Sequence, residues 1–155
     1  MYGRIYTIRL TPAAVSAALD ALEIVPATDK PVIVHKVVLT PLDSETNQQV
    51  QVSIRILPAT LTSGSTGAAA PTVGKRNGHD AAHAFTSENF NTSRATTSGT
   101  AQYVLNEAFP SQGGFEFLPD VFERPVVYAG EGFIVGIEES MAGASVGGYA
   151  VVEEL

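Results

Sequence analysis

The stretch Val50–Leu57 constrains the fold more than any other part of the chain, because apolar and polar residues alternate strictly along it. Its β-branched residues fall at every second position: Val50, Val52, Ile54 and Ile56. A period of two is typical of a strand with one buried and one solvent-exposed face, whereas a helix would distribute these residues around its circumference. The sequence therefore predicts a strand here, with Gln51, Ser53 and Arg55 facing solvent.

A second β-rich run, Pro31–Leu39, precedes this stretch. The link Asp43–Asn47 between the two runs is polar and consists of residues that favour turns. Two β-rich runs joined by a short polar link commonly form a hairpin. We therefore expect these two strands to pair with each other in antiparallel fashion.

Seven further stretches have the composition or the alternation of strands: Tyr2–Leu10, Leu22–Pro26, Thr100–Glu107, Phe115–Leu118, Arg124–Ala129, Phe133–Glu138 and Gly148–Glu154. Thr11–Leu22 is ambiguous, because Thr11-Pro12 suits a helix start while an apolar alternation already runs through Leu22. A short turn or helix-like connection is favoured there. Since turn signals recur and helical periodicity is almost absent, the sequence predicts an all-β sandwich or barrel, favouring an antiparallel jelly-roll-like domain of about eight to ten strands.

The chain of 155 residues suits a single domain, 1–155, and its 45% hydrophobic content is enough for a substantial core. From Thr60 to Thr100 the residues are mainly Ser, Thr, Gly, Ala and Asn, which predicts a long loop-rich insertion at about 60–100. Ala68–Val73 and Ala82–Phe85 are candidates for short edge strands within it. A loop of this length usually serves a function, so we expect it to reach a partner, and we expect trimming of Ser63–Gly74 to leave the fold intact. The candidate contact residues are Ser63, Gly64, Ser65, Thr66, Gly67, Thr72, Asn89 and Asn91.

The composition argues against several classes of function. Only 16% of the residues are charged, which favours an oligomer whose interfaces are depleted in charge. The net charge of −7 argues against nucleic-acid binding, which normally needs a basic surface. No apolar run has the length of a membrane span, and the first residues lack the apolar core of a signal peptide. Without cysteine, disulfides and thiolate metal sites are excluded.

The motifs that suggest chemistry lack the context that the chemistry requires. The run 143–147 matches G-x-S-x-G, but no histidine follows it, so we interpret it as a turn. His79 and His83 are four residues apart without an evident third metal ligand, and His35 fits the margin of the core, bonded to the backbone. The adjacent acidic pairs 138–139 and 153–154 would point to opposite faces of a strand. The sequence therefore predicts no enzyme, no cofactor and no metal site.

Several stretches together carry a resemblance to a known group of proteins: Leu22–Pro31, Val34–Leu39, Val52–Ile56, Ser63–Ser65, Asn89–Ser98, Arg124-Pro125, Phe133–Ile137 and Glu153-Glu154. In these stretches the chain resembles the small structural proteins encoded beside the capsid genes of tailed bacteriophages, which are taken to be head decoration (cement) proteins. The resemblance implies a virion protein on the capsid exterior, made in the host cytoplasm, with no catalytic residues. Its expected partners are the major capsid protein and further copies of itself, as a homotrimer, with no nucleic acid and no membrane.

Two other classes remain as alternatives. A carbohydrate- or ligand-binding β-sandwich of a phage tail or fibre would present exposed aromatic residues, but the sequence has no Trp, and most of its Tyr and Phe fall within strand patterns. A cupin-like enzyme would need a metal, for which three scattered His and no Cys are a poor set of ligands.

Overall fold

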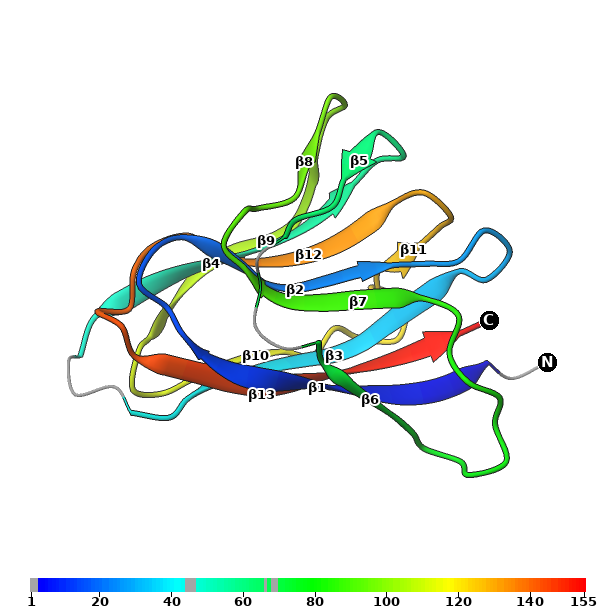
Figure 1. The fold of residues 1–155 in the computed structure, drawn as a ribbon, viewed down its shortest axis with the longest axis horizontal. Helices are drawn as coiled ribbons and strands as arrows, with labels where there is room; N and C mark the ends of the chain where they lie inside the picture. The colour runs from blue at the N-terminus through cyan, green and yellow to red at the C-terminus, as the bar shows by residue number, and fades with distance from the viewer. Residues whose placement is uncertain (1–2, 44–46, 66, 68–69) are drawn as a thin grey trace.

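Two antiparallel β-sheets pack face to face in the computed structural model, which describes residues 3–43, 47–65, 67 and 70–155 (Figure 1). The first sheet has the order β10 (Phe115–Phe117), β3 (Val32–Pro41), β13 (Ser145–Glu154), β1 (Arg4–Ala14) and β6 (Thr72–Lys75), with β11 (Val126–Val127) also paired to β3. The second has the order β7 (Thr86–Asn91), β2 (Leu19–Val25), β12 (Gly132–Ile137), β4 (Gln49–Leu57) and β9 (Gln102–Pro110). A small third sheet joins β5 (Leu61–Thr62) and β8 (Thr96–Thr97).

The connectivity of the eight main strands is that of a jelly roll. One sheet contains β1, β13, β3 and β10 side by side, and the other contains β2, β12, β4 and β9. The chain changes sheet at every step between these strands except from β4 to β9. This order is the pair of Greek keys that defines the fold. The prediction of an all-β, jelly-roll-like sandwich is confirmed.

The predicted pairing of the two strands at 31–39 and 50–57 is wrong. β3 lies in one sheet, between β13 and the β10 and β11 segments, while β4 lies in the other, between β12 and β9. The link between β3 and β4 therefore crosses from sheet to sheet, and its residues 44–46 lie outside the described residues. A polar link indicates only that the chain reverses direction. The reversal can connect two strands of one sheet or two strands of different sheets.

The ambiguous stretch at 11–22 contains no helix. β1 continues to Ala14, a bend follows, and β2 begins at Leu19. Val15 is fully buried in the core, and its backbone makes two hydrogen bonds: its N–H donates to the Ala144 carbonyl (3.0 Å), and its own carbonyl accepts from Met141 N (2.9 Å). These bonds to a distant part of the chain hold the stretch extended.

The main core fills the space between the sheets. The inward rows of β1 and β4 illustrate it, with Tyr6, Ile8 and Leu10 on one side and Val50, Val52 and Ile54 on the other, all buried. A second, smaller cluster of Leu57, Ala95 and Ile134 lies apart from it, packed with Leu61 and Ala101 from the segments around the small sheet. Because of this second cluster, β12 is buried on both faces rather than on one.

Candidate interaction surface

The segment 60–100, expected to be loop-rich with two short edge strands at most, contains the strands β5, β6, β7 and β8 among its described residues. The candidate edge strand at 68–73 overlaps β6, whereas 82–85 forms no strand. β6 pairs with β1, and β7 pairs with β2, so the segment adds an outer strand to each sheet on the same side of the sandwich. Between β6 and β7 the chain passes from one sheet to the other (Figure 1). There the Tyr6 hydroxyl donates to the Ala81 carbonyl (3.0 Å), and the Glu154 carboxylate accepts from Ala84 N (2.7 Å). We call this side of the sandwich the closed edge.

Two buried carboxylates of β2 attach the insertion to the outer face of the second sheet. Asp20 is fully buried and accepts hydrogen bonds from Arg55 (2.8 Å), Arg94 (2.9 Å) and the Ala95 backbone N–H (2.7 Å). Glu23, 2% exposed, accepts from the Gly64 backbone N–H (3.0 Å) and the Asn91 amide (3.3 Å). The two carboxylates thus accept the hydrogen bonds that backbone and side-chain donors of the insertion would otherwise donate to water.

An ion pair extends this network toward β12. The Arg94 guanidinium binds both oxygens of Glu138 (2.7 and 2.8 Å), and Ser53 donates a hydrogen bond to the same carboxylate. Glu138 is held in its charged form chiefly by the hydrogen bond from Arg94, which lowers the pKa of this carboxyl below its ordinary value. The polar face of β4, predicted to face solvent, is therefore partly covered: Ser53 is buried, and Arg55 lies in the network.

The predicted contact residues have different positions. Asn89 and Asn91 are buried in β7, so the prediction that they lie in an exposed loop is wrong. Gly64 is buried against Asn91 and Ser93, whereas Ser63, Ser65, Gly67 and Thr72 are exposed. Thr66 lies outside the described residues. The small and polar residues of this segment suggested an exposed loop. In the structure, however, a polar residue of β7, Asn91, is buried and donates its hydrogen bonds to Glu23 and Glu88 rather than to solvent.

The three histidines do not converge on a common site. His35 Nε2 is 2.9 Å from a Glu153 oxygen, so its partner is a carboxylate and not the expected backbone group. His83 contacts the Phe85 ring and carbonyl, and His79 is exposed in a turn. Within the described residues, no three His, Asp or Glu side chains are grouped so that they could hold a metal ion. Nor do these residues form a helix long and apolar enough to cross a membrane.

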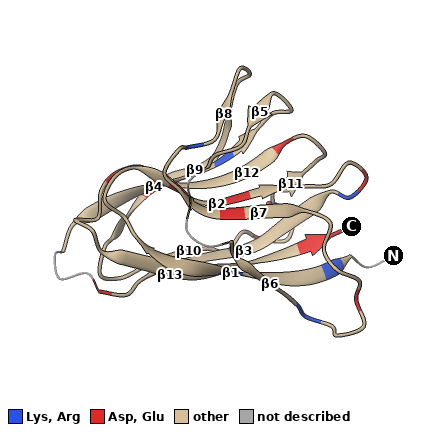
Figure 2. Cartoon of the chain, in the orientation of Figure 1, with Lys and Arg blue, Asp and Glu red and all other residues tan. Residues whose placement is uncertain are grey.

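The side opposite the closed edge is not covered by any further strand of the described chain. There β9 and β10 end their respective sheets, held together by Phe109 and Phe115, whose ring centroids are 5.9 Å apart. We call the residues 102–110 and 115–123 the open edge. Charged residues are sparse over the strands (Figure 2), so apolar and neutral side chains cover much of the outer surface.

Large apolar side chains are exposed along the open edge. Phe122 is 100% exposed and Val121 65%, and Tyr103, Val104 and Leu118 are exposed as well. These five account for most of the large exposed hydrophobic residues in the described part of the chain; the others are Leu42, Tyr128 and Leu155. Gathered surface apolar residues of this kind mark interaction sites in soluble proteins.

The prediction from sequence missed this surface, because it assigns residues 119–123 only to the connection between the predicted strands Phe115–Leu118 and Arg124–Ala129. The one signal for it is the presence of two large apolar residues, Val121 and Phe122, in this connection, where no alternation assigns them to a core.

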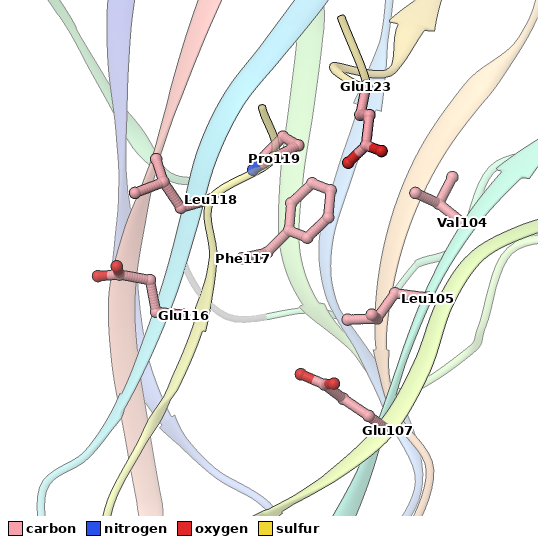
Figure 3. A pocket seen from close by; sticks show the side chains of 8 residues that line it. All are labelled: Val104, Leu105, Glu107, Glu116, Phe117, Leu118, Pro119 and Glu123. Carbon is pink, nitrogen blue, oxygen red and sulfur yellow. The ribbon is translucent and has the colours of Figure 1, made fainter. Parts of the chain in front are cut away.

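A cleft of about 470 Å³ opens between β9 and β10 (Figure 3). Its apolar lining comes from Val104, Leu105, Phe117, Leu118 and Pro119. Three glutamates also line it: Glu107, Glu116 and Glu123. Glu116 pairs with Lys36 (2.8 Å), and this hydrogen bond is the main cause that raises the pKa of Lys36.

The fold and this surface define a class: a jelly-roll sandwich with one closed edge and one open, apolar and acidic edge. Comparison with protein-family models, curated proteins and solved structures found no match.

Proposed function

We propose that this chain is a virion structural protein that binds the outside of an icosahedral bacteriophage capsid as a homotrimer and stabilises it. The observation that carries the proposal is the exposed apolar surface of the open edge, which has the composition of a protein-binding site. The sequence resemblance described above supplies the capsid as the partner. The jelly roll is also a fold that viral capsid domains use, which supports the proposal by analogy.

The proposed mechanism is mass action without chemistry. A protein that binds only the assembled shell stabilises that shell by its binding free energy. The many cross-strand bonds of the two sheets give a rigid body, so little conformational entropy is lost on binding. Because the insertion covers the closed edge, the exposed apolar residues of the open edge are the ones available for contact with the capsid.

Co-sedimentation with capsids of the encoding phage tests this proposal. We expect the chain to sediment with capsids and to raise the temperature at which they release DNA. Replacing Val121 and Phe122 by serine should abolish both effects. Leu42→Ser is the matched control, because Leu42 is 56% exposed but lies outside the open edge. Failure of the unaltered chain to co-sediment would refute the proposal. Light scattering of the pure chain tests the homotrimer.

A carbohydrate-binding module is the second candidate, favoured by one observation. Tyr103, Phe122 and Tyr128 are exposed aromatic side chains of the kind that stack on sugars. A reproducible hit on a glycan array, lost in Tyr103→Ala and Phe122→Ala variants, would favour this function over capsid binding.

A further inference from the structure

The outer side of β9 offers an unpaired row of backbone groups. β9 has nine residues, whereas β10 across the cleft has only three. No strand of the described residues pairs with the outer side of β9. Such an edge can accept an extended peptide as an additional strand, with backbone hydrogen bonds that do not depend on sequence.

The side chains beside this edge specify what kind of peptide fits. Leu105, Glu107 and Phe109 pair with Ile54, Val52 and Val50, which are core residues. Cross-strand partners share a face, so Glu107 lies on the inward face of β9 between two apolar residues. Phe117 approaches from β10, where it pairs with the core residue Val37. The cleft thus has an apolar floor of Leu105 and Phe117.

Two carboxylates point into this cleft. Figure 3 shows the side chains of Glu107 and Glu123 directed toward its centre, while Glu116 and Leu118 point away. Among the described residues, neither Glu107 nor Glu123 has a side-chain hydrogen bond or ion pair. Glu116, by contrast, is neutralised by Lys36. The cleft therefore presents two uncompensated negative charges beside apolar surface.

We propose that the cleft binds an extended polypeptide segment that adds to the second sheet as a strand beside β9 and carries aliphatic and basic residues in turn on its inward face, at every second position. Its aliphatic side chains would pack on Leu105 and Phe117. A Lys or Arg would place its methylene stem on the same surface and its charge between Glu107 and Glu123. Charge complementarity selects this partner over neutral or acidic segments.

A second copy of this chain fits the cleft poorly. Pairing of two β9 strands would bring both copies of Glu107 and Glu123 into one apolar space, and each chain already carries a net charge of −7. Like charges placed together disfavour such a contact. An inward-pointing charge on an edge strand also prevents edge-to-edge association. The occupant is therefore a different, basic polypeptide.

The inference rests on the proposed function in one respect, namely that the open edge is the surface used for binding. It adds the chemical class of the partner segment and the way in which it binds. The experiment below uses no capsid, so its outcome is independent of co-sedimentation. Capsid binding without peptide binding would overturn the inference alone, and peptide binding without capsid binding would refute the proposed function alone.

Fluorescence anisotropy with a labelled peptide tests the inference. The probe, called the Lys–Val peptide, is as long as β9 and has Val and Lys in turn at every second position, with Thr between them. The comparison, called the Glu–Val peptide, has Glu in place of Lys. We expect the full chain to bind the Lys–Val peptide with an affinity that falls as the salt concentration rises, and not to bind the Glu–Val peptide. An N-methylated Lys–Val peptide keeps the charges but lacks backbone donors, so it should bind at least about tenfold more weakly.

Charge-neutral variants test the two carboxylates. The double variant Glu107→Gln, Glu123→Gln should weaken binding of the Lys–Val peptide about tenfold or more, which corresponds to about 1.4 kcal/mol. The matched control, Asp29→Asn with Asp80→Asn, removes the same charge from residues that do not line the cleft and should leave the affinity unchanged. Equal binding by the double variant and the unaltered chain, or equal binding of the N-methylated peptide, would overturn the proposal. So would a double variant that self-associates without any change in peptide affinity.

Discussion

Ile54 shows how strongly a single inward position of β4 controls stability. It is fully buried, with Val135 of β12 on one side and Leu105 of β9 on the other. We expect Ile54→Asp to abolish cooperative folding, because desolvation of the carboxylate and lost packing together cost as much as the whole stability of a domain. Circular dichroism during thermal unfolding measures this. Gln49→Asp, at an exposed position of the same strand, is the control. A cooperative Ile54→Asp variant would contradict the assignment of the faces.

Arg55 was predicted to face solvent, where its removal should be mild unless that face lies in an interface, and the structure changes that expectation. Its guanidinium is one of three donors to the fully buried Asp20. Arg55→Ala leaves the carboxylate with two donors, so we expect a loss of about 1–3 kcal/mol in the free energy of unfolding. Urea titration measures the difference. Gln51→Ala, exposed on the same face of β4, should change it by less than about 0.5 kcal/mol. Equal effects of the two changes would show that the buried network adds no stability.

Glu138 makes stability depend on pH. Its pKa is lowered in the folded chain, mainly by the hydrogen bond from Arg94, from an ordinary value of 4.5. A lowered folded-state pKa stabilises the fold fully above the unfolded-state value, and this stabilisation is lost as the pH falls through the folded-state value. Urea unfolding should therefore show a constant stability difference between the unaltered chain and Glu138→Gln at neutral pH, which narrows below about pH 4.5. A difference that does not change with pH would contradict this role.

The insertion also contributes to the stability of the fold. Replacing residues 63–74 by a short Gly-Ser link removes the Gly64 bond to Glu23 and most of β6, whose residues Thr72, Val73 and Gly74 pair with β1. Contrary to the expectation from sequence, we expect a loss of about 2–4 kcal/mol, or a fall in Tm on the order of 10 °C. Replacing 77–79, a turn, by glycines is the control. Calorimetry of both variants decides between a structural insertion and a dispensable loop.

Sequence patterns identified elements better than they identified neighbours. The alternation in β1 and β4 was sufficient to assign strands, since it reflects burial of one face, whereas β9 was assigned from its composition. The partner of β3 could not be assigned in this way, because β13 lies more than a hundred residues away and its pairing depends on the whole fold. Polar residues of β7 had no local sign that Glu23 would satisfy them. At the candidate site, the exposed residues around Phe122 were missed, since their role depends on the absence of a covering strand.

At the scale of the molecule, the two edges of the sandwich differ in kind. The insertion covers one edge with backbone bonds and the aromatic contact of Phe85 with Tyr6, whose ring centroids are 5.7 Å apart. The opposite edge keeps its apolar residues exposed. The exposed apolar residues therefore distinguish the open edge as the preferred side on which partners could extend the sheets.

The strand order also determines when the molecule can fold. The central strand of each sheet, β12 in one and β13 in the other, follows all other strands in the sequence. Until residues 132–154 leave the ribosome, β1 and β3 have no strand between them, and neither do β2 and β4. The nascent chain therefore holds two incomplete sheets with apolar, unpaired edges. The two sheets can therefore be completed only after β12 and β13 have been synthesised, and the exposed intermediates are the stage at which chaperones would bind.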